Sequence, residues 1–398
     1  MDSVRGSKKT VTGEPARPVT IAQVAREAGV SKTSVSRFLG GELDALSENI
    51  RQQIASTIAR LGYQPNQMAR GLKRGRTRLI GMVVADMLNP YTVAVLQGVE
   101  AACQQHGYTL ILCNTGNDEQ RERQSLAALR SYSVEGLIVN TQGRNIESSD
   151  LQQADMPIVL VDRRIDGADF DLVGLDNVQA GRLATAHLIE QGFDAIAFIA
   201  PPLTGVSSRL MRAEGFQAVM AEHPGCVGEV LAVDLDDRPS IDAQVRQCLA
   251  QWRGRRVALL ASNGMVALEL ALMLQRLALR MPQDVGLLGF DELPWSPLAG
   301  LSTIEQQTYE IGFTAMTCML SRLQGEQCAP REVLLPGKLI VRNSTQGGKA
   351  GKGALEGGGR GRCPFFWESY GTGFIECIHT GKGHESARQG NGMRLKVS

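Results

Sequence analysis

The sequence predicts a small all-α domain followed by a larger α/β body that folds as two lobes. Three short segments with apolar residues at helical spacing lie within the first 64 residues. From Leu79 onward, apolar strands alternate with amphipathic helices, which is typical of parallel sheets built from βαβ units. This series then repeats once, so two similar α/β lobes are expected.

The first two helices are separated by a very short turn. Thr20 is placed to cap the first helix, and Ser31 to cap the second. Between them, Gly29 supplies the backbone freedom for a tight turn. The apolar positions of the first helix follow the three-and-four spacing and are Ile21, Val24, Ala25 and Ala28.

The second helix combines an apolar inner face with a basic, hydroxyl-rich outer face. Val35, Phe38 and Leu39 are expected to point inward. The outer residues lie near its N-terminal half, where a recognition helix meets DNA bases. Arg37 suits guanine O6 and N7, and Lys32 suits guanine or a phosphate. The alternative is a helical hairpin with a solvated polar face. The predicted DNA-reading residues are Ser31, Lys32, Thr33, Ser36 and Arg37.

A third helix and a basic linker complete the N-terminal part. Ile50, Ile54, Ile58 and Leu61 mark the helix, and Gly62 is a natural stop. Residues 65–78 are basic and form helix weakly, with glycines at 71 and 75, so we expect order there to be conditional. We predict a flexible arm at 1–17, a helix-turn-helix domain at 18–64 and a hinge at 65–78.

The body is predicted to contain ten strands before its last helix. The strands are expected at 79–85, 108–114, 136–140, 157–162, 171–175, 194–200, 228–234, 256–262, 285–290 and 301–305. The helices are expected near 91–106, 118–133, 177–191, 207–222, 240–252 and 264–279. A helix near 309–324 and a strand pair in 331–342 should cross back between the lobes. Lobe one then comprises about 79–176 with part of 307–345, and lobe two about 177–306 with the rest.

Strand ends nominate a ligand site, because ligands of open α/β sheets sit beyond the carboxyl ends of the strands. Hydroxyls, amides, an arginine and a carboxylate together suit a polyhydroxylated ligand. Three of the candidate residues have an alternative, purely structural role. In that alternative Ser208 merely caps a helix, Asp291 merely braces a loop, and Arg212 forms a surface ion pair. The candidates are Tyr91, Asn140, Asp162, Arg163, Ser208, Arg212, Ser262, Asp291 and Gln306.

Charge is distributed unevenly along the chain. Residues 1–78 carry 14 Lys and Arg against 6 Asp and Glu, whereas residues 79–345 carry 20 against 31. The near-neutral total of +1 therefore hides a basic head on an acidic body. Only the head should attract phosphates.

Several other classes of protein are disfavoured. No apolar run approaches the roughly 18 residues of a membrane span, and no apolar stretch follows the N-terminal lysines as in a secretory signal. The eight dispersed cysteines are expected to be reduced thiols, as in a cytosol. No catalytic or nucleotide-binding motif stands in a suitable context, so neither an enzyme nor a cofactor is predicted. Cys363, Cys377, His379 and His384 fit no common zinc spacing, so no metal site is expected.

Residues 18–345 resemble a LacI-family transcriptional regulator. The matching pieces are Val19–Ala25, Ala28–Ser31, Val35–Arg37, Pro65–Leu72, Pro282–Asp291 and Leu301–Gln306. The resemblance implies a helix-turn-helix domain joined to a two-lobed α/β effector domain of the periplasmic-binding-protein-like type I. It places Lys32, Thr33 and Arg37 at base-reading positions and Leu72 at a minor-groove wedge that kinks the operator. An ordinary buried leucine is the alternative for Leu72. The predicted hinge contacts with DNA are Asn66, Ala69 and Leu72, and Gly71 makes this hinge depend more on DNA for its order.

The resemblance also bears on the ligand. Arg212 and Asp291 fall on effector-contact positions of the family, whereas Ser262-Asn263-Gly264 stands where the family commonly has Asn-Asp. The runs Asp86–Val95 and Val161–Arg164 look most like the branch that senses sugar acids, in particular 2-ketogluconate. A sugar acid needs a second cation beside Arg212, for which Arg163 and Arg209 are the two candidates. Both could equally be solvated.

These features predict a cytoplasmic repressor that binds a palindromic DNA operator as a homodimer and contacts no membrane. Ligand binding should change the spacing of the two hinges and so weaken DNA binding, although a corepressor of opposite sign is equally possible. A neutral sugar or a purine remains an alternative ligand, and a transporter-type sugar-binding protein an alternative class. We expect residues 346–398 to be a disordered tail or an out-of-frame extension.

Overall fold

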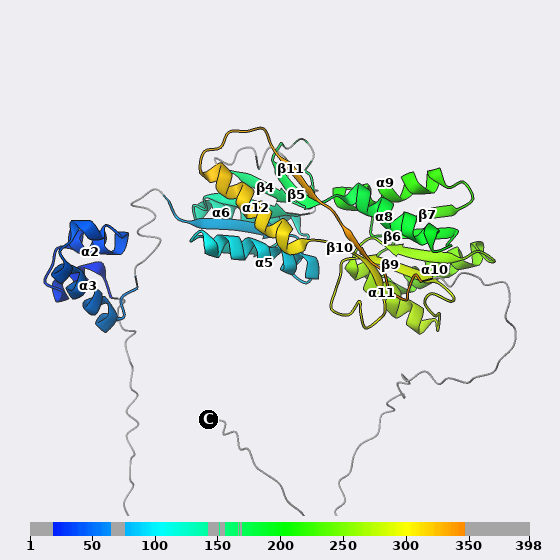
Figure 1. Cartoon of the computed structure of the whole chain (residues 1–398), viewed down its shortest axis with the longest axis horizontal. Coiled ribbons are helices and arrows are strands. Elements are labelled where there is room, and N and C mark those ends of the chain that lie inside the picture. The colour runs from blue at the N-terminus through cyan, green and yellow to red at the C-terminus, as the bar shows by residue number, and fades with distance from the viewer. Residues whose placement is uncertain are drawn as a thin grey trace, which may run out of the picture. The chain divides into compact units, whose positions relative to one another are not determined.

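A computed structural model of the chain describes residues 19–64, 76–141, 151, 156–165, 167 and 169–346. The predicted arm at 1–17, the hinge contacts Asn66, Ala69 and Leu72, and residues 347–398 lie outside these ranges. The described part contains a helical N-terminal domain and two α/β lobes (Figure 1).

The N-terminal domain is formed by α1 (Ile21–Glu27), α2 (Lys32–Gly40), the 3-10 turn η1 (Leu43–Ala45) and α3 (Glu48–Leu61). Both predicted caps are confirmed: the Thr20 side chain accepts a hydrogen bond from Gln23 N, and that of Ser31 accepts one from Ser34 N. Gly29 makes the turn at φ +64°, and Gly62 ends α3 at φ +59°. The domain closes over a core centred on the fully buried Val24, Val35 and Ile54.

Lobe one is a parallel sheet with helices on both faces. Its strands are β1 (Leu79–Val84), β2 (Thr109–Asn114), β3 (Gly136–Asn140), β4 (Ile158–Val161), β5 (Asp171–Leu175) and β11 (Glu332–Leu335). They lie in the order β11-β5-β4-β3-β1-β2, and each pairing is parallel. Helices α5 (Pro90–Gln105) and α12 (Thr308–Leu323) contribute to one apolar core, and α6 (Glu119–Ser131) contributes to a second.

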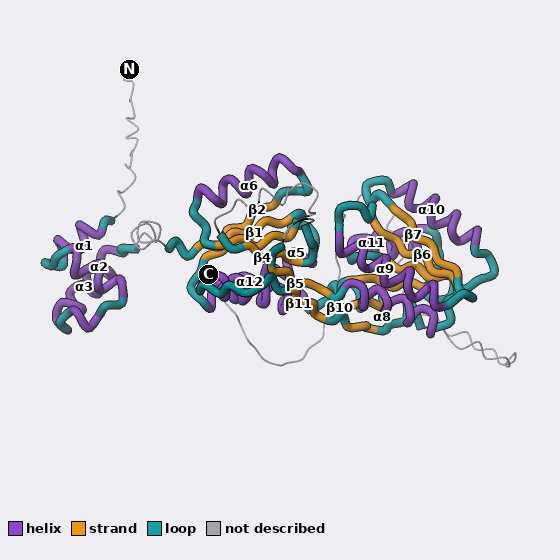
Figure 2. The backbone as a smooth tube through the Cα atoms, turned by 90° about the horizontal axis from the view of Figure 1, so that it is seen from above, coloured by secondary structure: helices purple, strands orange, loops and turns teal. Residues whose placement is uncertain are grey.

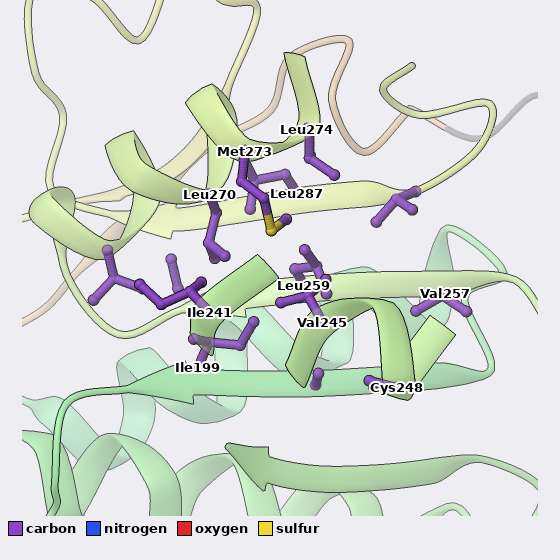
Figure 3. Close-up of a cluster of buried hydrophobic side chains, with 14 of the residues drawn as sticks. Ile199, Ile241, Val245, Cys248, Val257, Leu259, Leu270, Met273, Leu274 and Leu287 are labelled. Carbon is purple, nitrogen blue, oxygen red and sulfur yellow. The ribbon is translucent and has the colours of Figure 1, made fainter. Parts of the chain in front are cut away.

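Lobe two repeats this plan, except that its edge strand β12 runs antiparallel to its neighbour β10. Its strands are β6 (Ala195–Ala200), β7 (Val227–Ala232), β8 (Val257–Ala261), β9 (Gly286–Phe290), β10 (Ser302–Glu305) and β12 (Lys338–Ile340), in the order β12-β10-β9-β8-β6-β7. One core lies beneath α8 (Asn177–Glu190) and α9 (Ser207–Glu222). The other lies beneath α10 (Arg238–Gln251) and α11 (Gly264–Arg276), where Leu259, Leu270 and Leu287 meet (Figure 3). Burying each such side chain contributes about 1.5–3 kcal/mol.

Three chain crossings join the lobes. They follow β5, β10 and β11, as the tube in Figure 2 and the long strand segment in Figure 1 show. The predicted elements match the observed ones within a few residues, with one difference. The two strands expected as a pair in 331–342 do not pair with each other, because β11 joins β5 in lobe one and β12 joins β10 in lobe two. Pro336 and Gly337 carry the chain across between them.

The helix pair α8 and α9 approaches unusually closely in lobe two. A Cβ added to Gly181 would lie 2.4 Å from the Arg212 carbonyl oxygen, and one added to Gly215 would lie 2.2 Å from that of Val178. Only glycine therefore permits this crossing. The crossing fixes the backbone of Arg212 against α8. None of the helices in the described ranges is long and apolar enough to cross a membrane.

Candidate functional site

The outer face of α2 keeps most of its predicted polar residues exposed. Lys32, Thr33 and Arg37 are exposed, with Arg37 Nε 4.0 Å from a carboxylate oxygen of Glu42. Such a surface ion pair is weak and leaves the guanidinium able to exchange partners. The N-terminus of α2 also favours phosphate, because the helix dipole places partial positive charge there.

Two of the predicted DNA-reading residues, Ser31 and Ser36, are less available for contact with DNA than expected. Ser36 was expected to face outward but is half-buried, since it lies beside the inward-facing Val35. Ser31 is exposed, yet its hydroxyl is already engaged with Ser34 as the helix cap. Lys32, Thr33 and Arg37 therefore form the available part of this surface.

The predicted ligand residues converge where the two lobes face each other. Tyr91 lies in the first turn of α5, Asn140 is the last residue of β3, and Asp162 and Arg163 follow β4 in lobe one. Eight of the nine are at most 9% exposed, and the Arg163 side chain is 14% exposed. From lobe two, the strand ends and the start of α9 supply Ser208, Arg212, Ser262, Asp291 and Gln306.

Arg212 is held rigidly from several sides. Its Nε donates to Asn177 Oδ1 at 2.7 Å, and its Nη1 donates to the Ser262 carbonyl at 2.6 Å. The guanidinium lies 4.4 Å from the centroid of the Phe290 ring. Its Nη2 is 3.9 Å from Asp162 Oδ1 and so forms an ion pair between the lobes. Such a fork is already oriented to donate to a ligand oxygen at little entropic cost.

Asp291 is braced by hydrogen bonds to its carboxylate. It adopts φ +74°, and its Oδ2 accepts from Gly264 N at 2.8 Å at the start of α11. Gln306 Nε2 donates to its Oδ1. Burial raises the pKa of the Asp291 carboxyl, against the opposing effects of Arg212 and of these two hydrogen bonds. Asp291 thus braces a loop, as the simpler interpretation held, and also presents a buried carboxyl to the site.

The site contains buried polar atoms that have no hydrogen-bond partner among the described residues. Leaving such a group unpaired costs about 1–3 kcal/mol, so a cluster of them points to a ligand that satisfies them. Burial and the negative charge of Asp162 also raise the pKa of Tyr91, so this phenol remains a neutral donor. The unpaired atoms are Tyr91 Oη, Asp162 Oδ1, Arg163 Nε and Nη1, Ser262 Oγ and Gln306 Oε1.

The two candidates for a second cation have different surroundings. Arg163 Nε is 3.6 Å from Asp162 Oδ2, and its Nη1 is buried without a hydrogen bond. Arg209 instead donates from Nη1 to the Pro202 carbonyl at 3.2 Å. Arg163 is therefore the candidate whose unbonded donors are buried in the site, where an anionic ligand could accept from them.

A pocket of about 420 Å³, mouth included, opens between the lobes beside this cluster. Its walls come from α5, from the segment after β9 and from the crossing after β10. Of the predicted ligand residues, Tyr91, Asp291 and Gln306 line this pocket.

Sequence reasoning missed two residues here. Asn177 orients Arg212 while its own Nδ2 donates to the Leu175 carbonyl at 3.1 Å. Thr141, directly after β3, has a buried hydroxyl without a partner among the described residues. Both follow strand ends, so the rule that nominated the other residues could have found them.

The fold and its two sites define a class: a DNA-binding regulator that pairs a helix-turn-helix head with a two-lobed ligand-binding body. Residues 20–66 match the model of bacterial regulatory proteins of the lacI family, and residues 185–345 match that of a periplasmic binding protein-like domain. The chain belongs to the LacI family of transcriptional regulators.

Its relatives are transcriptional regulators. The chain is 48% identical to the HTH-type transcriptional regulator PtxS of Pseudomonas aeruginosa, over 82% of this chain and 96% of that protein. It is 36% identical to the HTH-type transcriptional regulator KdgR of Bacillus subtilis, over 85% of this chain and 99% of that protein. A crystal structure of the Lac repressor dimer bound to operator and the anti-inducer ONPF matches with a TM-score of 0.72 and 24% identity. The match covers 83% of this chain and 99% of that one. That last likeness concerns the fold.

Proposed function

We propose that the protein is a cytoplasmic repressor of carbohydrate-catabolic genes whose operator affinity is lowered by a sugar acid. 2-Ketogluconate or a related aldonic or keto-aldonic acid is the proposed ligand. The observation that carries this choice is Arg163, whose Nε and Nη1 are buried without a hydrogen bond beside Arg212. A neutral sugar would use only one guanidinium, whereas a carboxylate uses the second.

The remaining site groups suit the polyol part of such a ligand. Tyr91 Oη and Ser262 Oγ can donate or accept, and Gln306 Oε1 accepts from a hydroxyl. We propose Asn140, Asp162, Ser208, Arg212 and Asp291 as further contacts or as supports for them. We propose that the protein binds this ligand without converting it chemically.

Two contacts across the cleft support control of DNA binding by lobe closure. The Arg212 to Asp162 ion pair and the bond from Arg164 N to Ser207 Oγ, 2.8 Å long, both join the lobes. A ligand that binds one lobe arrangement more tightly shifts the equilibrium toward it. We propose that two copies bind a palindromic operator through Lys32, Thr33 and Arg37, and that the ligand-bound arrangement releases it. The operator-bound Lac repressor dimer provides support by analogy.

Calorimetric titration of the full-length protein tests the ligand class. The panel comprises gluconate, 2-ketogluconate, glucose and a purine, and operator affinity is followed by fluorescence anisotropy with and without each compound. We expect an acid to bind and to weaken operator binding. Unchanged operator affinity across the panel would contradict the proposal.

A matched pair of arginine variants tests the second cation. Arg163→Met removes the charge but keeps much of the apolar stem, and should weaken acid binding about 30-fold, equivalent to about 2 kcal/mol. Arg209→Met should change it little, because Arg209 is engaged with Pro202. If Arg209→Met weakened acid binding more than Arg163→Met did, Arg209 would be the second cation.

A further inference from the structure

The chain makes a tight, strained turn where it leaves β4. Asp162 adopts φ +66°, and the next amide, Arg163 N, donates to the Val161 carbonyl at 2.8 Å. This is a three-residue γ-turn whose central residue has a positive φ, a conformation that is rare and strained for a residue other than glycine. Such a turn persists only where the surrounding contacts hold it in place.

Lobe one supports the turn from one side. Asp162 N donates to the Val173 carbonyl of β5 at 2.9 Å. A Cβ added to Gly174 would lie 3.1 Å from Asp162 Cα, so the turn packs directly against the backbone of β5. The Arg164 guanidinium pairs with Glu332 at the start of β11. The turn therefore has little room to move further into lobe one.

Lobe two holds the other side of the turn through α9. Arg164 N donates to Ser207 Oγ at 2.8 Å, and Ser207 is the first residue of α9. Arg212, further along the same helix, pairs with Asp162 at 3.9 Å. Arg212 is itself a proposed ligand residue, so a ligand competes for its donors. The Ser207 hydroxyl instead bonds a backbone amide, and this bond can join the lobes without any contribution from a ligand.

We propose that residues 161–164 and Ser207 form an interlobe latch, in which the Ser207 hydroxyl keeps the turn strained and the lobes joined in the unliganded protein. When the lobes separate, the Arg164 amide loses its acceptor and the turn can relax. The larger the fraction of protein that rests with its lobes joined, the less ligand is needed to occupy the site. Ser207 is therefore a positioning residue that sets the sensitivity to ligand. This inference rests on the proposed function, because it takes the joined arrangement to be the one that binds ligand.

Hydrogen exchange of the unliganded, full-length protein, resolved to single amides, tests the latch directly. Ser207→Ala removes the acceptor and places a good helix former in α9. We expect the Arg164 amide to exchange at least about 3-fold faster in this variant. Ser207→Thr keeps the hydroxyl and should exchange like the unaltered protein. The Asp162 amide, bonded within lobe one, is the internal control and should not change.

Two results would overturn the latch. One is unchanged exchange of the Arg164 amide in Ser207→Ala. The other is an equal rise at the Asp162 amide, which would mean that lobe one itself has loosened. If Ser207→Ala does not fold, the unaltered protein still gives a test: a saturating acid should slow exchange at Arg164, and equal exchange with and without it overturns the inference.

Calorimetric titration with gluconate and 2-ketogluconate tests the effect on sensitivity. Ser207→Ala should weaken acid binding about 3- to 10-fold and raise the acid concentration that releases the operator by the same factor. Ser240→Ala on α10, whose Oγ accepts from Gln244 within lobe two, is the control and should bind normally. Unchanged affinity in Ser207→Ala overturns the inference. If neither acid binds the unaltered protein, the proposed function fails, and exchange in the unliganded protein decides separately whether the latch exists.

Discussion

At the scale of single residues, Arg37 is the side chain best placed to read a base. It is exposed on α2, and its contact with Glu42 is a weak surface pair at 4.0 Å. Arg37→Ala should cost about 1–3 kcal/mol of operator affinity and relax base preference. Anisotropy titrations with operator variants measure both. Arg60→Ala is a suitable control, because Arg60 lies on α3 and pairs with Glu27; an equal loss in both variants would argue against base reading by Arg37.

Arg212 is the residue on which the ligand response depends most. Arg212→Ala should spare operator binding and abolish the effect of the ligand, since the variant removes the fork that joins Asn177, Ser262 and Asp162. The same anisotropy assay with and without 2-ketogluconate checks this. An intact response in this variant would show that the ligand site lies elsewhere.

Sequence reasoning located strand ends better than it assigned partners. The ends of β3, β4, β8 and β9 were within a residue of prediction, so Asn140, Asp162 and Asp291 could be nominated from spacing alone. The choice between Arg163 and Arg209 could not be made, because it depends on the Pro202 carbonyl seven residues away from Arg209. The pairing of Glu292 with Arg342, fifty residues later in the chain, was also not predictable.

At the scale of elements, Glu135 fixes the point where the chain enters β1. Its Oε1 accepts from Arg78 N at 2.6 Å, and its Oε2 accepts from the Tyr108 hydroxyl at 3.4 Å. Arg78 is held at φ +56°, which non-glycine residues rarely adopt. This carboxylate therefore stabilises a strained junction between the hinge and lobe one.

Glu135→Ala should destabilise lobe one by about 1–3 kcal/mol, because it removes a charged acceptor from a backbone N–H. Glu135→Gln should lose less, since its amide oxygen can still accept. Urea unfolding measures both, with Glu100→Ala on α5 as the surface control. Equal stability of the alanine variants would show that the junction holds without this contact.

Strands β11 and β12 show that the sequence predicts a strand without predicting which strand it pairs with. Both strands were expected from their apolar pattern, but strand periodicity carries no information on the partner strand. The partner is decided by where the crossing at Pro336 and Gly337 falls. A Cβ on Gly337 would lie 2.8 Å from a methyl group of Ile304, so this crossing is tightly packed.

At the scale of the whole molecule, two buried groups contribute to the response to acid. Burial lowers the pKa of His187, whose Nε2 lies 2.8 Å from the Thr345 hydroxyl, with Glu190 opposing the shift. Burial would raise the pKa of Asp171, but hydrogen bonds from Arg322 and Arg331 outweigh it and hold that pKa well below the usual range. The folded state thus prefers neutral His187 and ionised Asp171.

Stability should fall in two stages as the pH is lowered. His187 costs stability below its unfolded pKa of about 6.5, and Asp171 loses its contribution below about 3.9. His187→Gln should flatten the first stage, between neutral and mildly acidic pH, because the variant has no group that titrates there. Urea midpoints at several pH values check this, with the exposed His223→Gln as control. A slope that persists in His187→Gln would assign the first stage to another group.

A pair of truncations tests the role of the tail. Ser344 Oγ donates to the Leu287 carbonyl at 2.6 Å and accepts from Ser302 N at 2.7 Å, so the segment before residue 346 is bonded into lobe two. Ending the chain after 346 should leave unfolding and operator binding unchanged. Ending it after 341 should destabilise lobe two by about 1 kcal/mol or more per lost buried hydrogen bond. Weaker operator binding by the longer truncated chain would give the tail a function.

The chain crossings also dictate an order of events during synthesis. Helix α12 and strand β11 complete lobe one, yet they follow every helix of lobe two in the chain. Domains generally fold as units while the chain emerges from the ribosome, N-terminal first. Lobe one must therefore wait with the inner faces of β1 and β3 incompletely covered until lobe two has been made. The N-terminal helices face no such delay, so the nascent protein acquires its DNA-reading head well before it acquires the means to be regulated.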